Sequence, residues 1–364
     1  MPISKSSRAL VATATIALLA GCSGGSMTSP LSSVGSQSIS HQSTVGAQSV
    51  NHPGFRADTL IVKPDVAQLI TGGTPHVIKW DKGASFKGTA LVTDSGTNEV
   101  YLVSSKGKLK SVQPKGSGWS EPQGVGVDAK GNFYVADTAN SRIVVLSAKG
   151  KTLAEISDPG QYPVGVAINA KGQIGVSNII STSDGAGSIT FYSSYKAKSA
   201  TGTATGFLAR DYFIGADAEG NFYIDGETDS SSYGVGTVAY GGSTISNTGI
   251  TPEFLFPGGV NVYTGKDDKK GKGSETLGVG DQSGYQVFNY ALPGYAAGPT
   301  VSLGGGSDEV QWSLDSAQSV AGAADAGLAQ AEFWAWPAGG SSPSGTIGGF
   351  SEPIGIGFSP TGVE

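Results

Sequence analysis

The stretch Ser120–Gly150 constrains the fold more than any other, because weaker copies of it recur before and after it. It reads SEPQGVGVDAKGNFYVADTANSRIVVLSAKG, in which apolar and polar residues alternate between short turns that contain Gly, Asn and Ser. With the TLAEI that follows, this pattern predicts four short antiparallel strands. A lone sheet of that kind cannot bury both of its apolar faces, so neighbouring copies must cover it. The repeat therefore predicts an all-β ring of four-stranded blades, a β-propeller.

The two ends of the repeat array complement each other. Residues 89–109, TALVTDSGTNEVYLVSSKGKL, match the later part of a blade and lack its innermost strand. Residues 351–362, SEPIGIGFSPTG, match residues 120–131 without a gap. Between these two copies lie five full units of roughly 46 residues each, in the usual range for four strands. We therefore expect a six-bladed β-propeller whose first blade is completed by the C-terminal strand, since an open seam would leave two unpaired edges.

Composition agrees with one turn-rich β domain. Of the 364 residues, 57 are glycine, which is roughly twice the average usage. The glycines lack the three-residue period of collagen, and 14% charged residues are few for a disordered chain. The length alone would also allow two or three domains. We assign residues 58–364 to a single propeller domain.

The amino terminus has the pattern of a secretory signal. Lys5 and Arg8 precede the apolar run Ala9–Ala20, which at about twelve residues is too short to span a bilayer. Residues 19–22, Leu-Ala-Gly-Cys, resemble a bacterial lipobox, and the resemblance implies a lipid anchor on Cys22. An ordinary secretory signal that ends at a chance cysteine is the alternative. We expect residues 1–22 to be a lipoprotein signal peptide, and the mature chain to lie in the cell envelope on the periplasmic or cell-surface side.

The segment that follows is predicted to be a tether. Residues 23–55 contain no Asp, Glu, Lys or Arg and are rich in Ser, Gly, Thr and Gln, so they bury too little apolar surface to fold alone. We assign residues 23–57 to this Ser/Gly-rich flexible segment. Cys22 is the only cysteine, which rules out an intrachain disulfide. The net charge of −6 and the lack of basic runs beyond residues 266–272 argue against a nucleic-acid partner.

Three motifs in the best repeat carry a resemblance to a known family. They are Pro122-x-Gly-Val-x-Val-Asp128, Gly131-Asn-Phe-Tyr-Val-Ala-Asp-Thr138 and Asn140-Ser-Arg-Ile143. These residues resemble NHL repeats, which form six-bladed propellers. The family includes protein binders, RNA binders and enzymes, so the resemblance implies a scaffold and does not choose among these activities.

One polar position recurs at the predicted end of each second strand. Its residues are Asp94, Asp137, Asn178, Asp225, Asp281 and Asp325. A ring of such groups on one face is a possible cation or sugar site. Asp and Asn at a strand end also accept hydrogen bonds from backbone N–H groups two residues further on, in an Asx turn. Because the position repeats in every blade, we favour the structural interpretation.

The sequence contains no local motif of nucleophilic or zinc catalysis, and we assign no catalytic residue. His76 is the only histidine near the ring and is interpreted as structural. The scarcity of histidine weakens a resemblance to the streptogramin lyases, in which a histidine acts as base. Six-bladed enzymes similar to gluconolactonases remain an alternative, since they hold calcium with carboxylate and amide groups at the channel mouth. No metal ligands are assigned.

We expect a lipid-anchored cell-envelope propeller that acts as a binding or interaction module and not as an enzyme. Its partner is an unidentified protein, peptide or glycan. Candidate binding residues are Trp119, Asp137 and Tyr162, because Trp119 and Tyr162 fall at junctions between predicted blades. The alternative is a metal-dependent hydrolase or lactonase with Asp and Asn ligands at the central channel, and only this alternative requires a cofactor, calcium. A purely structural surface protein is a third class.

Overall fold

The computed structural model describes residues 73–229, 232–253, 255–264 and 274–361. All of them fall in the compact unit Val45–Glu364. The predicted signal peptide, Cys22 and the predicted tether lie outside the described residues. The described residues form 26 β-strands and the two short 3₁₀ helices η1 (Lys82–Ala84) and η2 (Thr138–Asn140), and they contain no α-helix. Within these ranges no helix is long and apolar enough to cross a membrane.

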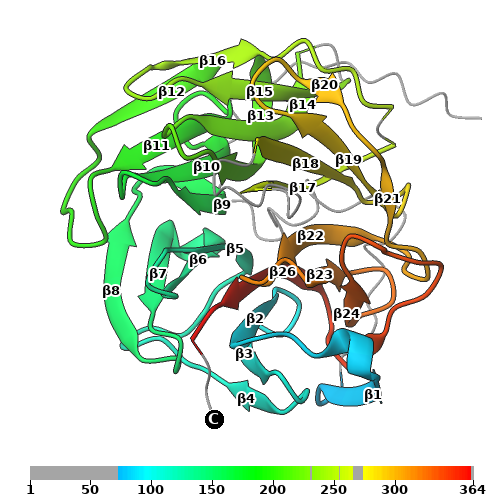
Figure 1. The fold of residues 1–364 in the computed structure, drawn as a ribbon. Coiled ribbons are helices and arrows are strands. Elements are labelled where there is room, and N and C mark those ends of the chain that lie inside the picture. The colour runs from blue at the N-terminus through cyan, green and yellow to red at the C-terminus, as the bar shows by residue number, and fades with distance from the viewer. Residues whose placement is uncertain (1–72, 230–231, 254, 265–273, 362–364) are drawn as a thin grey trace, which may run out of the picture. The chain divides into compact units, whose positions relative to one another are not determined.

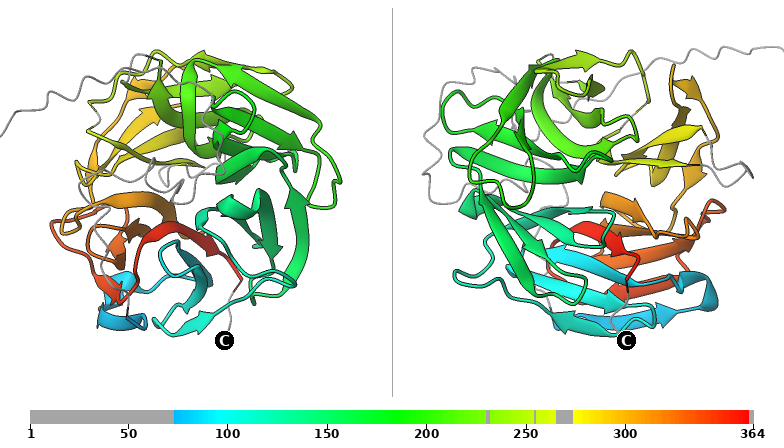
Figure 2. Two further views of the ribbon diagram at one scale, coloured as in Figure 1. Left: turned by 180° about the vertical axis from the view of Figure 1, so that it is seen from behind. Right: turned by 60° about the vertical axis from the view of Figure 1, so that its left-hand side comes forward.

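The strands form antiparallel groups of four, which we call blades and number along the chain. Blade one has the strand order β26 (Pro353–Ser359), β2 (Thr89–Asp94), β3 (Glu99–Ser104) and β4 (Leu109–Ser111). Blade two has the order β5 (Pro122–Val127), β6 (Phe133–Asp137), β7 (Arg142–Leu146) and β8 (Thr152–Ser157). In blade one the C-terminal strand β26 pairs with β2 from Thr89↔Ser359 to Asp94↔Pro353, and both views of Figure 2 show the red strand beside the cyan one. The predicted completion of the first blade is confirmed.

Blades three and four merge at their outer edges. Blade three comprises β9 (Gln161–Ile168), β10 (Ile174–Ser181), β11 (Ser188–Tyr192) and β12 (Gly202–Gly206). Blade four comprises β13 (Leu208–Ala216), β14 (Phe222–Thr228), β15 (Tyr233–Val238) and β16 (Thr244–Asn247). The outer strands β12 and β16 pair in parallel at Thr205↔Thr244 and Gly206↔Ile245, which gives one continuous eight-stranded sheet. The repeat pattern did not predict this junction.

The last two blades are less regular than the others. Blade five comprises β17 (Pro257–Thr264), β18 (Glu275–Asp281), β19 (Gln286–Ala291) and β20 (Ala296–Ala297), and β21 (Val301–Ser302) also pairs with β19. Blade six comprises β22 (Glu309–Leu314), β23 (Val320–Asp325), β24 (Gln330–Ala335), β25 (Gly345–Gly348) and a fifth, outer strand, β1 (His76–Trp80). His76 is exposed on that edge strand, where its Nδ1 lies 3.1 Å from the Thr74 carbonyl oxygen.

Each pair of neighbouring blades encloses one apolar layer. Between blades one and two, Leu91 and Val100 pack with Phe133 and Val135, and corresponding clusters lie at the other five junctions. The cluster between blades six and one includes Phe333 from β24 and Phe358 from β26. Figure 1 shows the innermost strands β26, β5, β9, β13, β17 and β22 around a common centre. The strands are apolar on both faces because each sheet is covered on both sides.

Candidate functional site

In blades one, two, five and six, the repeated carboxylate binds the segment that leads into the innermost strand of its own blade. Asp94 accepts hydrogen bonds from Ser351 N at 3.0 Å and Glu352 N at 2.8 Å. Asp281 accepts from Phe256 N, and Asp325 accepts from the backbone N–H groups of residues 307 and 308. The second strand runs antiparallel to the innermost one, so its last residue lies beside the start of that strand. The structural interpretation fits these contacts, but the donors lie on another segment and not two residues further on as in an Asx turn.

Two members of the repeated set occupy different positions from those predicted. Asn178 and Asp225 lie inside β10 and β14, which extend beyond them. At the register position of Asp137, opposite the innermost strand, blade four has Gly226, which pairs with Asp211. The side chain of Asp225 accepts a hydrogen bond from Phe213 N at 2.8 Å. The carboxylate of Asp225 therefore lies one register position away from the position that Asp137 occupies in blade two.

The three candidate binding residues do not form one surface. Asp137 is fully buried, where Oδ1 accepts from Ser120 N at 2.8 Å and Oδ2 accepts from Arg142 Nε at 2.6 Å and from Asn140. Burial raises the pKa of Asp137, and these hydrogen bonds lower it. Trp119 is buried between blades one and two and donates its indole N–H to the Val112 carbonyl. Tyr162 is half-buried against another apolar cluster.

That cluster crosses the centre of the ring. Four of its members come from different innermost strands, namely Val164, Phe213, Val310 and Ile354. On each strand they precede the residues that line the central cavity. A dry layer of side chains therefore lies across the ring on the side where the innermost strands begin.

The cavity lies on the other side of this layer and has a volume of about 450 Å³. Its wall is drawn from all six innermost strands, and includes Val125, Ala167, Ile168, Ile214, Asn261, Val262, Ser313 and Phe358. Gln311 reaches across the centre: its amide donates to the Val125 carbonyl at 3.1 Å and accepts from the N–H groups of Val125 and Ile356, each at 3.0 Å. Sequence reasoning missed Gln311 and Asn261, because the cavity arises only when six separate strands meet.

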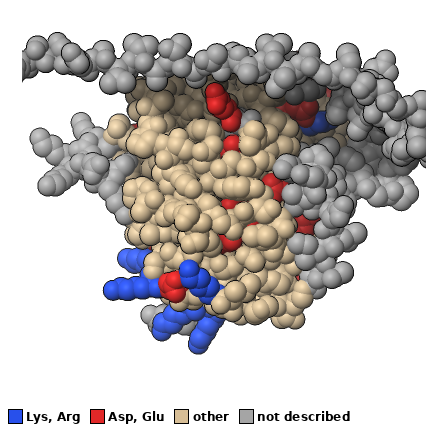
Figure 3. Space-filling view, turned by 90° about the vertical axis from the view of Figure 1, so that its right-hand side faces the viewer, with Lys and Arg blue, Asp and Glu red and all other residues tan. Residues whose placement is uncertain are grey.

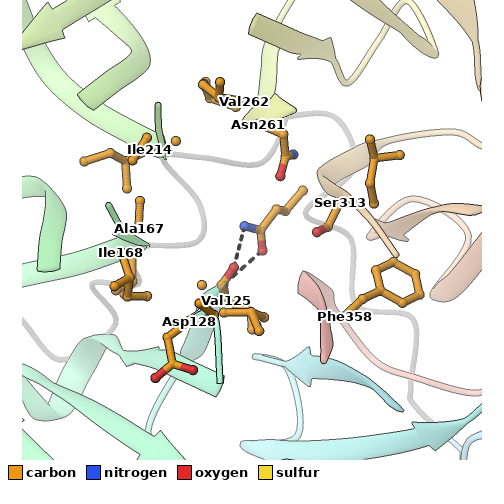
Figure 4. A pocket seen from close by; sticks show the side chains of 18 of the residues that line it. Val125, Asp128, Ala167, Ile168, Ile214, Asn261, Val262, Ser313 and Phe358 are labelled. Atoms are coloured by element: carbon orange, nitrogen blue, oxygen red, sulfur yellow. Dashed lines mark hydrogen bonds between the residues drawn. The ribbon is translucent and has the colours of Figure 1, made fainter. Parts of the chain in front are cut away.

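Much of the exposed cavity wall is polar, but polar side chains are few among the described lining residues and, apart from Asp128, they are uncharged. The Asn261 amide and the Ser313 hydroxyl point inward (Figure 4), and Asn261 Nδ2 donates to the Trp312 carbonyl at 2.7 Å. The Asp128 carboxylate points away from the centre (Figure 4) and accepts from Lys130 N, Asn132 N, Asn132 Nδ2 and the Tyr134 hydroxyl. Asp217 in blade four accepts a similar set of bonds. Asp128 therefore has a structural role in a repeated turn.

A second group of polar side chains lies outside the cavity, inside blade six. Glu309, Asp325 and Glu332 are all buried, and one carboxylate oxygen from each lies within 4.8 Å of the others. Sequence reasoning identified Asp325 but missed the two glutamates. An alignment of the blades would have revealed Glu309, because the residue opposite the strand-end position is proline in four other blades: Pro122, Pro163, Pro257 and Pro353.

The structure defines the class of the protein as an all-β propeller. The family model of the NHL repeat matches residues 120–146, which span β5 to β7. A chain in the crystal structure of a nidogen/laminin complex is similar in fold, with a TM-score of 0.54 and 12% identity, over 76% of this chain and 99% of that one. A crystal structure of a protein of unknown function from Bacteroides caccae gives a TM-score of 0.51 and 13% identity, over 74% and 98%. No curated protein matches the chain.

Proposed function

We propose that this chain is a binding module of the cell envelope, held at the membrane by a lipid on Cys22, and that its central cavity receives part of the ligand. The observation that carries the proposal is the cavity itself. Its volume of about 450 Å³ falls in the range of ligand sites, and its wall combines apolar side chains with a few inward polar groups. The apolar layer across the ring limits approach to the side where the innermost strands end.

The chemistry of the wall favours an uncharged ligand group. Among the lining residues that the structure describes, Asp128 is the one charged side chain, and its carboxylate is already engaged in its turn. Asn261 and Ser313 can pair with the amide or hydroxyl groups of a peptide or glycan. A propeller of similar fold occurs in the nidogen/laminin complex, which supports a protein or peptide partner. Figure 3, viewed from the side of blades five and six, shows most of the visible Lys and Arg side chains gathered at one edge and a further one beside acidic side chains at the opposite side. The described part of this face gives no support to a nucleic-acid partner.

The cavity is tested with a variant that fills it. Ser313→Trp places a large side chain inside the wall, whereas the control Ser193→Trp alters an exposed residue. Both variants and the wild type are applied to peptide and glycan arrays after their melting temperatures have been compared. We expect ligands that bind the wild type and the control but not Ser313→Trp. If Ser313→Trp binds the same ligands as the wild type, the cavity is not the binding site.

The anchor is tested by Cys22→Ala. Lipid attachment to a lipobox cysteine requires its thiol, so this variant should fail to incorporate an alkyne-labelled fatty acid and should leave the membrane fraction. Ser23→Ala, which changes the neighbouring residue and keeps the thiol, serves as the control. Fatty-acid labelling of Cys22→Ala equal to that of the wild type would refute the lipoprotein assignment.

The hydrolase or lactonase alternative requires several Asp or Asn side chains to converge at the cavity. Among the described lining residues these are Asp128 and Asn261, and the Asp128 carboxylate points away from the centre (Figure 4). The geometry therefore favours binding over turnover. Lactone hydrolysis by the purified protein that is lost in Asn261→Ala would reverse this preference.

A further inference from the structure

Blade six contains three acidic residues at the end of its buried layer. Glu309 is the first residue of β22, Asp325 is the last residue of β23, and Glu332 lies on β24. Their exposed fractions are 3%, 0% and 1%, and one ligand oxygen from each lies within 4.8 Å of the others. The three carboxylates therefore converge on one point away from solvent.

Two of these side chains lack the partners that burial demands. Both carboxylate oxygens of Glu309 and Oε2 of Glu332 are enclosed and have no hydrogen-bond partner among the described residues. The ion pairs of the described chain are formed by Lys79, Arg142 and Arg210 and involve none of the three. An isolated buried carboxylate costs several kcal/mol even after relaxation. Among the described residues, no cationic side chain pairs with these carboxylates to offset that cost.

Burial and mutual repulsion raise the pKa values of the two glutamates in this group. Burial, followed by the nearby Asp325 and Glu332, raises the pKa of Glu309 to about 10. Burial and Asp325 raise the pKa of Glu332 to about 8. Protonation would remove the charge, whereas a bound cation would balance the charge and also give the carboxylate oxygens a partner. A bound cation satisfies both needs at once.

The other blades show that the fold does not require the two glutamates. Opposite the strand-end residue, four blades have proline where blade six has Glu309. The position of Glu332, which pairs with Ala323, is occupied in blade two by Val144, which pairs with Val135. Asp325 is the one member of the group that the common pattern supplies. Blade six thus has two further buried carboxylates beside the strand-end carboxylate that it shares with blades one, two and five.

We propose that Glu309, Asp325 and Glu332 form a structural site for a divalent, oxygen-preferring cation, with calcium as the ion that fits best. Calcium binds oxygens at 2.3–2.6 Å, so opposite ligands are about 4.6–5.2 Å apart, whereas magnesium at 2.0–2.1 Å spans only about 4.2 Å. The three ligand oxygens, all within 4.8 Å of one another, lie within this calcium span. The ion would join β22, β23 and β24, away from the central cavity.

The surrounding backbone is arranged for close approach to these oxygens. A Cβ at Gly306 would collide with Glu309 Oε1 and would lie 2.8 Å from Asp325 Oδ2. Asp325 is held in place by Ser307 N, Asp308 N and Leu328 N, at 2.8, 3.1 and 2.9 Å. Asp308 N and Leu328 N both bond to Oδ1, so Oδ2, which accepts from Ser307 N, keeps a further lone pair for a metal. A glycine thus leaves room for the carboxylates, and the backbone orients one of them.

The experiment measures calcium on the purified protein. Because the site is buried, the protein is unfolded in urea with chelator and refolded in calcium, in magnesium or in chelator alone, then desalted. Metal content is determined by atomic emission, and the melting temperature by circular dichroism. The variants are Glu309→Gln and Glu332→Gln, and the control is Glu253→Gln, which alters an exposed carboxylate. Glu309→Pro, which places the residue of four other blades in blade six, covers the case in which a glutamine variant does not fold.

We expect the wild type and the control to retain one calcium per chain and to melt higher in calcium than in chelator. The two glutamine variants should bind calcium at least about tenfold more weakly, and Glu309→Pro should fold with a melting temperature independent of calcium. The site is refuted if the wild type retains no calcium and melts alike in all three media. Calcium retention by Glu309→Gln and Glu332→Gln equal to that of the wild type would also refute it, because the ion would then bind elsewhere. Retention of magnesium in place of calcium would overturn the choice of ion.

Discussion

Blades two and six share the order of their four inner strands, to which blade six adds β1, but they differ in the charged side chains around the strand-end carboxylate. In blade two, Asp137 pairs in register with Arg142, and the guanidinium contacts both Asp137 and Glu155. In blade six, the corresponding Asp325 pairs in register with Gln330, which brings no charge. Compared with blade two, blade six therefore lacks one buried cation and has two more buried carboxylates.

The difference shows which part of a repeat the fold needs and which part can diverge. Both blades keep the carboxylate that binds the backbone N–H groups ahead of the innermost strand. What varies is the counterion: a side chain in blade two, and in our proposal a bound metal in blade six. The NHL match covers residues 120–146, within the blade that carries its own cation. A repeat with a weak sequence match can thus keep the backbone of the blade and differ in the charged groups that it buries.

The largest effect should come from removal of the strand that lies between these two blades. Deletion of residues 352–364 removes β26, which pairs with β2 and contributes Ile354, Ile356 and Phe358 to buried clusters. Each such side chain is worth about 2–5 kcal/mol, so their sum approaches or exceeds the total stability of about 5–15 kcal/mol of a typical protein. We expect insoluble protein or loss of the cooperative melting transition, measured by circular dichroism.

A shorter truncation provides the control for this deletion. Removal of residues 362–364 keeps the whole of β26 and should leave the melting temperature unchanged. If the longer truncation melts like the full chain, completion of blade one by the C-terminal strand is wrong.

The next largest effect should come from Arg142→Met in blade two. The variant keeps much of the aliphatic bulk but leaves Asp137 buried without a cation, for which we expect a loss of about 3–5 kcal/mol. Urea unfolding at pH 7 measures it. Arg210→Met is the matched control, because the Arg210–Glu227 pair is more exposed, and it should cost about 1 kcal/mol or less. Equal losses in the two variants would show that Asp137 does not depend on its partner.

The ring, its closure and the blade boundaries could be predicted from the sequence because they depend on local patterns. Strand alternation, turn residues and the match of residues 351–362 to residues 120–131 are visible without coordinates. The pairing of the edge strand β1 with blade six was missed, since its partner β25 lies at the other end of the chain and both strands are short. The parallel contact of β12 with β16 has no pattern of its own. Pairings between distant short strands depend on packing and leave little trace in the sequence.

The candidate sites were less predictable for a related reason. Each of the six innermost strands contributes only a few residues to the cavity wall. Within its own segment, a residue such as Asn261 has no sequence pattern that marks it as part of a site. Trp119 was predicted to be a candidate binding residue because loops between blades are often exposed. Its ring instead packs in the apolar layer between blades one and two. Among the buried acidic residues that sequence reasoning missed, Glu309 and Asp211 could have been found by aligning the blades, since each is acidic where other blades have proline.

Blade four buries the carboxyl of Asp225, and we expect it to make the stability of the protein depend on pH. Burial raises the pKa of Asp225 from 3.8 to about 7. Such a carboxyl stays protonated in the folded protein after the unfolded chain has lost its proton, so its contribution to stability is complete in acid and is lost as the pH rises from about 4 to about 7. Asp225→Asn keeps the oxygen that accepts from Phe213 N and should flatten this slope.

We expect the variant to gain about 2–4 kcal/mol over the wild type between pH 4 and pH 8, measured by urea unfolding at both values. Asp211, Glu309 and Glu332 also have raised pKa values, so the difference between the two proteins, and not the wild-type slope alone, carries the result. Asp184→Asn is the control, since the pKa of Asp184 is lowered. Parallel stability curves for wild type and Asp225→Asn would contradict the assignment.

The smallest expected effect transfers the arrangement of blade two into blade six. Gln330→Arg introduces a guanidinium at the register position of Arg142, opposite Asp325. In chelator the new cation should partly neutralise the three carboxylates and stabilise the protein by about 1–2 kcal/mol, because hydrogen bonds to charged groups are worth about that much. In calcium the gain should vanish, since the guanidinium and the metal compete for the same oxygens. Glu99→Arg in blade one is the control, because residue 99 stands opposite Asp94, in a blade outside the proposed site, and calcium should not change its effect. A gain for Gln330→Arg that is the same with calcium and with chelator would mean that the buried acids of blade six are held by protons alone.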